Sequence, residues 1–241
     1  MNSKFFFIAV FFALYFVNAQ KNIVVEYTVS KESGGVGKEI FLKISNNISI
    51  FGKTENVNSI AGNETKDHKL YIKPKKSKLI FKDFGDKFLI SNERIVLDEF
   101  IVRDSVMNIN WKITKEEKNI LGYLCKKAEA HFRGRDYVAY YTENINKSDG
   151  PWKLTGLPGL ILEAFTKDNY IRFTAVNISL EDKMISFENP FTENRLDFET
   201  YSEFKNEYVK TYHELKIGKK LPDGHIIKSQ IPKSNIEVYV E

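Results

Sequence analysis

Apolar and polar residues alternate with a period of two over most of the chain, which is the pattern of strands that bury one face. The segments concerned are short and rich in Ile, Val, Phe, Tyr and Thr, which suit a half-buried pleated surface. They comprise residues 23–29, 39–45, 48–51, 69–73, 78–81, 87–91, 95–102, 110–114, 120–132, 137–142, 160–165, 170–180 and 236–241. Because no long helical pattern separates them, we expect successive strands to pair antiparallel.

Turn residues mark where these strands end. Asn46-Asn47, the stretch 83–86 and Gly134 can each form a tight turn, and residues 167–169 join the hairpin of 160–165 with 170–180. Two mostly polar stretches, 30–37 and 53–67, are predicted loops.

One helix is predicted near the C-terminal end of the sequence. Tyr201, Phe204, Tyr208 and Tyr212 recur at spacings of three and four, after a capping box at 200–203. Gly218 and then Pro222 would end it. We interpret the aromatic stripe as a packing face, the alternative being a row of ligand contacts. The fold class is therefore mainly β: a curved antiparallel sheet or half-barrel with one amphipathic C-terminal helix packed on it.

Residues 1–19 have the order of charge and hydropathy found in a secretory signal peptide. Lys4 is followed by a nearly continuous apolar run at 5–17 and by modest residues at 17–19. The run is shorter than the ~20 residues of a membrane-spanning helix, which disfavours an N-terminal anchor. We expect a mature chain of one domain over 20–241, without a transmembrane segment, that is exported to the periplasm or cell envelope, with secretion as the alternative.

The overall charge of the chain excludes few classes of binding partner. The chain has 36 Lys and Arg against 32 Asp and Glu, with the two signs interspersed. The basic cluster at 73–78 is interpreted as a solvated hairpin tip, with a phosphate or membrane contact as the alternative. No basic helix or aromatic-basic motif indicates nucleic acid as a partner.

Cys125 is the single cysteine, so the chain has no internal disulfide. Strict alternation over 123–132 places the odd-numbered residues, Cys125 and His131 among them, on one face and the even-numbered residues on the other. We interpret Cys125 as a small buried hydrophobe. The alternative is a thiol activated by Lys126 and Lys127.

The most distinctive segment is Gly156-Leu157-Pro158-Gly159-Leu160-Ile161, in a connection that also contains Pro151 and Trp152. Proline fixes its own backbone and glycine permits unusual conformations, which predicts a rigid turn centred on Pro158 and Gly159 and leading into a strand. The turn is either a buried corner of the sheet or an apolar lip around a binding surface.

This hexapeptide and its surroundings resemble the GLPGLI family of exported Bacteroidota proteins. The resemblance also covers Trp111, residues 120–128, Tyr140-Tyr141-Thr142 and Gly150-Pro151-Trp152. The chain departs from similar proteins at Tyr140, where they often carry tryptophan. The resemblance implies an exported protein and assigns no activity.

Candidates for acid–base chemistry are His131, Arg133, Arg135 and Asp136, although a turn at Gly134 would divide them. Cys125 and His131 would lie about 20 Å apart on one strand, too far for a nucleophile and its base. The four histidines lack the spacing of metal ligands, so we expect no metal and no other cofactor.

The sequence thus predicts a non-enzymatic binding or carrier protein for an apolar or peptide-like ligand, or for an envelope protein. The alternatives are a thiol-dependent or acid–base envelope enzyme, and a structural component of an envelope assembly. The predicted binding residues are Tyr140, Tyr141, Pro151, Trp152, Gly156, Leu157, Pro158, Gly159 and Leu160.

Overall fold

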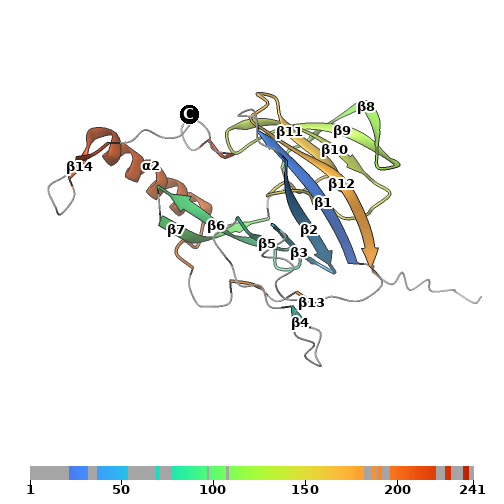
Figure 1. Ribbon diagram of the computed structural model, residues 1–241, viewed down its shortest axis with the longest axis horizontal. Helices are drawn as coiled ribbons and strands as arrows, with labels where there is room; N and C mark the ends of the chain where they lie inside the picture. Colours follow the sequence, from blue (N-terminus) through green and yellow to red (C-terminus); the bar gives the residue numbers. More distant parts are fainter. Residues whose placement is uncertain are drawn as a thin grey trace, which may run out of the picture.

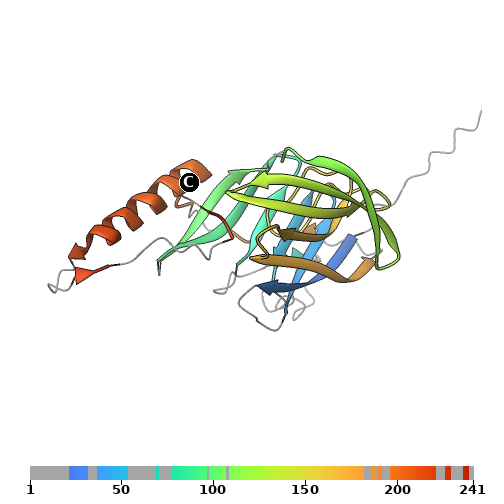
Figure 2. The same cartoon turned by 90° about the horizontal axis from the view of Figure 1, so that it is seen from above.

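The computed structural model describes residues 22–31, 37–53, 69–70, 78–96, 98–106, 109–181, 186–187, 189–191, 196–220, 226–228 and 236–238. Among these residues, eleven strands form one antiparallel sheet in the order β7-β6-β5-β3-β2-β1-β12-β11-β10-β9-β8. The sheet is open and strongly curved (Figure 1, Figure 2), which confirms the predicted fold class. The strands are β1 (Asn22–Lys31), β2 (Lys38–Ser45), β3 (Ile48–Gly52), β5 (Ile80–Asp83), β6 (Phe88–Ile95), β7 (Asp98–Ser105), β8 (Lys112–Ile120), β9 (Tyr123–Phe132), β10 (Arg135–Thr142), β11 (Leu160–Thr166) and β12 (Ile171–Glu181).

Most neighbours in this sheet are also neighbours in the sequence, as short hairpin connections require. The exception is β1, which pairs with β2 on one side and with β12 on the other. The predicted turns at 46–47 and 83–86 join β2 to β3 and β5 to β6, and the hairpin of β11 with β12 is confirmed.

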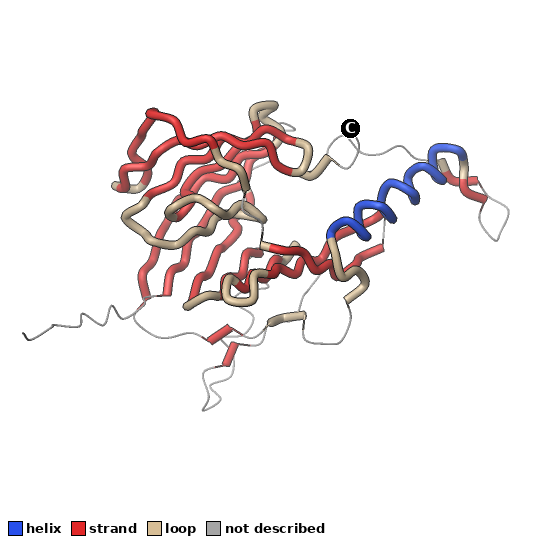
Figure 3. Tube along the Cα trace, turned by 180° about the vertical axis from the view of Figure 1, so that it is seen from behind, coloured by secondary structure: helices blue, strands red, loops and turns tan. Residues whose placement is uncertain are grey.

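The main hydrophobic core lies between the sheet and the long connection from β10 to β11. Edge-on aromatic contacts link Tyr27 with Phe51 and Phe51 with Phe173, at ring-centroid distances of 6.5 and 6.0 Å. The Tyr27 hydroxyl donates a 2.6 Å hydrogen bond to the carbonyl of Ile161, which ties β1 to β11 across the core. The connection, drawn as a tan loop in Figure 3, runs in front of the strands.

Helix α2 (Tyr201–Ile217) builds a second, smaller core on the outer part of the sheet (Figure 2). Its predicted aromatic stripe is buried, with Phe204, Tyr208 and Tyr212 packed in one cluster with Ile95 and Val102 of β6 and β7. The capping box at Thr200 is present and Gly218 ends the helix, both as predicted. The packing interpretation of the stripe is confirmed.

Two predicted strands were wrong because each contains a turn. Residues 95–102 are divided by a turn at Val96, whose φ of 57° reverses the chain between β6 and β7. Residues 120–132 are divided by Leu121 and Gly122, both with positive φ, so β8 ends at Ile120. Neither turn has the Asn-Gly or Asp-Gly signature of a two-residue hairpin, and the apolar pattern continues through both.

The predicted alternation along 123–132 was also wrong. Cys125 is buried together with Ala128, Ala130 and Phe132, while Leu124 is 49% exposed. The burial pattern therefore changes phase between residues 125 and 128. The facing strand β8 has an irregular register there, between Ile113 and Glu117.

Two short pairs of strands lie outside the main sheet. They are β4 (Lys69–Leu70) with β13 (Ser186–Phe187), and β14 (Lys219–Lys220) with β15 (Ile226–Ile227). Residues 236–238, the described part of the predicted strand 236–241, are not in a strand, so that prediction was wrong over those residues. The predicted signal peptide and most of the basic cluster 73–78 and of the loops 30–37 and 53–67 lie outside the described residues.

Candidate functional site

The connection that carries the predicted binding residues is largely buried. Trp152 and Leu157 are each 1% exposed and Leu160 is fully buried. Trp152 stacks on Tyr137 at 5.9 Å and meets Phe132 edge-on at 5.7 Å. The structure therefore gives these side chains a packing role, and a direct contact with a ligand would require the connection to leave the core.

The predicted rigid turn is present and is tighter than a four-residue turn. The amide of Gly159 donates a 2.8 Å hydrogen bond to the carbonyl of Leu157, so Pro158 alone lies inside the turn. A Cβ atom on Gly159 would lie 2.1 Å from the carbonyl oxygen of Thr142. The hexapeptide thus forms a corner where two backbone segments approach too closely for any side chain.

The nine predicted binding residues do not share one surface. Pro158 and Gly156 are exposed, while Tyr141 is buried. Tyr140, its neighbour on β10, is half-buried below Lys118, whose Nζ lies 3.8 Å from the ring centroid. Successive residues of a strand point to opposite faces, which separates Tyr140 from Tyr141.

Cys125 is fully buried, which confirms the interpretation of a small hydrophobe. Burial raises the pKa of the Cys125 thiol to about 11. Because the thiolate is the reactive form, the environment of Cys125 is unlike that of a catalytic thiol.

Native protein at pH 8 is expected to leave Cys125 unlabelled by iodoacetamide, since neither the thiolate nor a path to it is available. Mass spectrometry after short exposure should find less than one tenth of the chains modified, and complete modification in 8 M urea. Rapid labelling of folded protein would contradict the buried position.

The acid–base candidates are divided over three places. The His131 Nδ1 atom lies 2.8 Å from Asp136 Oδ1 across the β9–β10 hairpin, and both side chains are mostly exposed. Arg133 pairs with Asp104 of β7, and Arg135 pairs with Asp168. The predicted turn at Gly134 is present and causes this separation, since Arg133 and Gly134 both have positive φ.

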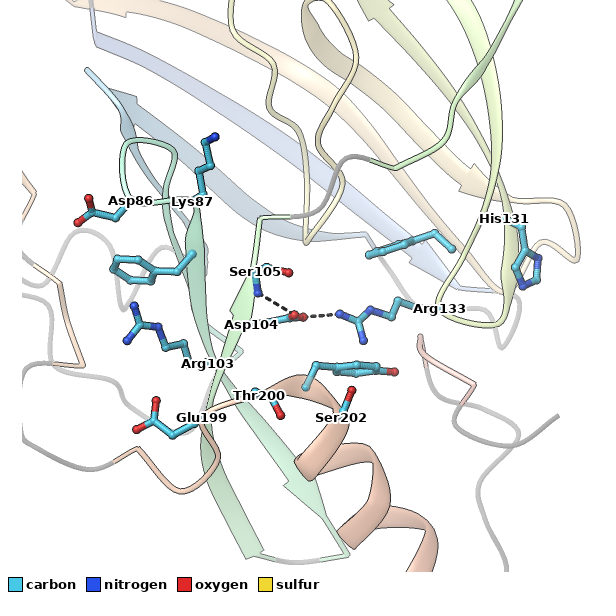
Figure 4. Close-up of a pocket in the computed structure, with 13 residues that line it drawn as sticks. Asp86, Lys87, Arg103, Asp104, Ser105, His131, Arg133, Glu199, Thr200 and Ser202 are labelled. Carbon is cyan, nitrogen blue, oxygen red and sulfur yellow. Dashed lines mark hydrogen bonds and ion pairs between the residues drawn. The ribbon is translucent and has the colours of Figure 1, made fainter.

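A cleft of about 650 Å³ lies where the β6–β7 hairpin, the β9–β10 turn and the start of α2 meet (Figure 4). Four separate segments of the sequence line it: Asp86, Lys87, Phe88, Arg103, Asp104, Ser105, His131, Phe132, Arg133, Glu199, Thr200, Tyr201 and Ser202.

The Asp104–Arg133 ion pair lies at the centre of the cleft (Figure 4). The amide of Ser105 donates a 2.8 Å hydrogen bond to Asp104 Oδ1. Burial raises the pKa of the Asp104 carboxyl, against the opposing effect of the Arg133 guanidinium. The ring centroid of Tyr201 lies 3.0 Å from the guanidinium carbon of Arg133, so this pair is held against an aromatic face.

The walls of the cleft alternate aromatic and charged groups. On one wall the guanidinium of Arg103 lies 4.6 Å from the ring centroid of Phe88. The lining contains as many cationic residues as anionic ones: Lys87, Arg103 and Arg133 against Asp86, Asp104 and Glu199. Such a lining offers donors, acceptors and ring faces to a ligand without a net charge.

The described residues contain no group of three or more His, Cys, Asp or Glu that could hold a metal ion. Within the described part of the chain, no helix has both the length and the hydropathy needed to cross a membrane.

Sequence reasoning missed this cleft because its lining comes from four separate segments. The capping box at Thr200 and the turn at Gly134 were each recognised as local features, but no local pattern indicates that they face one another. Arg103 and Asp104 directly follow the predicted strand 95–102, which contains the unrecognised turn at Val96.

Fold and cleft together define a β-rich domain with an open antiparallel sheet and a cleft beside its C-terminal helix. Residues 42–203 match the family model described as N-glycanase peptide, N-terminal domain. Because the match covers more than half of the chain, the chain belongs to this family.

Two solved structures of PNGF-II, in space groups C2 and P21, share the fold. Each is 16% identical to this chain and covers 80% of it, with TM-scores of 0.53 and 0.54. The chain spans about one third of the length of these structures, 33% and 34%. No curated protein sequence matches the chain.

Proposed function

We propose that this chain is an exported, non-enzymatic recognition domain that binds a neutral, hydroxyl-rich carbohydrate in the cleft beside α2. The observation that carries the proposal is the Asp104–Arg133 pair in the cleft, with the ring of Tyr201 against the Arg133 guanidinium. The membership of the N-glycanase peptide, N-terminal domain family supports a role connected with glycans.

Sugar chemistry suits this arrangement. A pyranose ring carries C–H groups on a face, which pack on an aromatic ring, and hydroxyl groups at its edge, which both donate and accept hydrogen bonds. Arg103 and Arg133 can donate to such hydroxyls, and Asp104 and Glu199 can accept from them. The balance of cationic and anionic residues favours a neutral ligand over an acidic one.

The cleft also changes the class of ligand that we propose, because the connection 150–159 had predicted an apolar or peptide-like ligand. An apolar ligand would need the side chains of Trp152 and Leu157, which are buried. A ligand in which a carbohydrate is attached to a peptide would agree with the predicted peptide-like ligand, and its carbohydrate would bind in the polar cleft. From the resemblance to the GLPGLI family we also propose that the chain is exported. The order of charge and hydropathy over residues 1–19, which is that of a signal peptide, supports this.

Binding of neutral oligosaccharides to the purified chain tests the proposal. Titration calorimetry with a panel of neutral and acidic N-linked oligosaccharides is expected to detect binding of neutral members. Arg103→Ala should weaken it at least about 10-fold, because a hydrogen bond to a charged group is worth about 1.5–3 kcal/mol. Arg94→Ala is the matched control, since Arg94 lies on the same hairpin and pairs with Glu99.

Three results would contradict the proposal. The first is the absence of binding across the panel, and the second is an equal effect of Arg103→Ala and Arg94→Ala. The third is release of glycan from a glycopeptide incubated with the chain, measured by mass spectrometry, which would make the chain an enzyme.

A further inference from the structure

Directly behind the cleft lies a buried cluster of three charged side chains. Lys153, from the long connection, places its Nζ 2.7 Å from Glu237 Oε1 and 2.9 Å from Glu93 Oε1 of β6. The side chains of Lys153 and Glu237 are each 1% exposed. Charges so deeply buried are costly unless they are paired, so the cluster fixes the relative positions of three distant segments.

Glu93 and Lys153 keep their charges over a wide pH range. Burial opposes ionisation of Glu93, but Lys153 and Lys78 outweigh it and hold the pKa of that carboxyl at about 2. Burial alone would lower the pKa of Lys153, but Glu237 and then Glu93 outweigh it and raise the pKa above the usual lysine value. The Glu93 carboxylate is therefore neutralised only near pH 2, and the Lys153 ammonium only at strongly basic pH.

Glu237 belongs to a short segment, 236–238, that docks on the β9–β10 hairpin. The amide of Val238 donates a 3.0 Å hydrogen bond to the carbonyl of Arg133, and the Tyr137 hydroxyl donates one of 3.3 Å to the carbonyl of Ile236. A Cβ atom on Gly134 would lie 2.7 Å from the carbonyl oxygen of Val238, so the two backbones are in close contact.

The same residues that hold this segment also form the cleft. Arg133 binds the segment through its carbonyl and forms the centre of the cleft through its guanidinium. The Nζ of Lys153 lies 5.7 Å from the ring centroid of Tyr201, on which Arg133 also packs. Burial and next the carboxylate of Glu237 raise the pKa of the Tyr201 hydroxyl, which places Glu237 beside that ring.

We propose that Glu237 is a positioning residue for the cleft: it holds Lys153 and Tyr201 in the places that set the cleft floor, so that carbohydrate affinity depends on the docked 236–238 segment. The inference rests on the proposed function for its ligand. The observation that carries it is the chain of contacts from Glu237 through Lys153 and Tyr201 to Arg133.

Glu237→Gln tests this in the full chain, because glutamine keeps the volume and removes the charge. The dissociation constant of a neutral oligosaccharide is expected to rise at least 5-fold at a temperature where the variant remains fully folded. Glu143→Gln is the control, since Glu143 forms an exposed pair with Lys126, and should change affinity less than 2-fold.

A second readout does not need a ligand. In protein labelled with ¹³C-tyrosine, the Tyr201 ring resonance, assigned with Tyr201→Phe, should shift in Glu237→Gln while that of Tyr27 stays in place. Tyr137→Phe, which removes only the hydroxyl bonded to Ile236, should shift the Tyr201 resonance by a smaller amount and provides a milder test if Glu237→Gln fails to fold.

Unchanged Tyr201 resonances in both variants would overturn the inference, as would a shifted resonance with unchanged affinity. Absence of carbohydrate binding by the unaltered chain would contradict the proposed function instead. The Tyr201 resonance alone would then decide whether Glu237 positions the cleft floor.

Discussion

Gly159→Ala is expected to destabilise the chain by at least about 3 kcal/mol, at the upper end of single substitutions. The added Cβ would lie 2.1 Å from the carbonyl oxygen of Thr142 and 3.1 Å from the Cα of Glu143. Both neighbours are backbone atoms at the end of β10, so relief requires the long connection to move away from the sheet. Urea unfolding, followed by the fluorescence of the buried Trp152, measures the loss.

Two matched variants separate close approach from ordinary backbone effects. Gly122→Ala has a positive φ of 83° but meets no atom within 4 Å, so it should cost only about 1–2 kcal/mol. Pro158→Ala removes an exposed ring next to Gly159 and should cost about 1 kcal/mol or less. A loss for Gly159→Ala no larger than that for Gly122→Ala would refute the close backbone contact.

Lys82→Met should cost about 3–5 kcal/mol, because it leaves a buried carboxylate without its counter-charge. Lys82 on β5 is fully buried, and its Nζ lies 2.5 Å from Asp149 Oδ1 and 2.9 Å from the carbonyl of Gly150. This pair pins the start of the connection 149–159 to the inner face of the sheet. Such a loss is a large part of the about 5–15 kcal/mol that stabilises a typical domain.

The double variant Lys82→Met/Asp149→Asn should recover most of the lost stability, since asparagine keeps the acceptor for the Gly150 amide and carries no charge. Lys167→Met removes a half-exposed partner of Glu129 and should change stability by less than about 1 kcal/mol. Equal losses for Lys82→Met and Lys167→Met in urea unfolding would show that burial of the Lys82 pair is unimportant.

The fold was predictable where local pattern and tertiary environment agree. Alternation predicted the strands of the sheet, and the capping box with the aromatic stripe predicted α2. The turns at Val96 and at Leu121-Gly122 were missed because the apolar pattern runs through them and because neither Val96 nor Leu121 is a typical turn former, although Gly122 is one. Positive φ at valine or leucine is imposed by the pairing of the flanking strands, which the sequence does not reveal locally.

The candidate site was less predictable, for a different reason. An apolar connection with Trp152 and Leu157 suggests either a core segment or a binding lip, and only the folded chain shows that both side chains are buried. The cleft uses ordinary charged residues, such as Arg103 and Asp104, whose significance arises from long-range packing against α2. A buried charge at Lys153 is equally hidden, because its partner Glu237 lies 84 residues further along the chain.

The central claim is that the cleft beside α2 is a carbohydrate-recognition site, and a crystal structure of the chain with a neutral N-linked oligosaccharide tests it most directly. The account predicts a sugar in the cleft with its hydroxyls bonded to lining residues such as Arg103 and Arg133. A sugar bound elsewhere, such as on the opposite face over Tyr140, with the cleft empty, would contradict it.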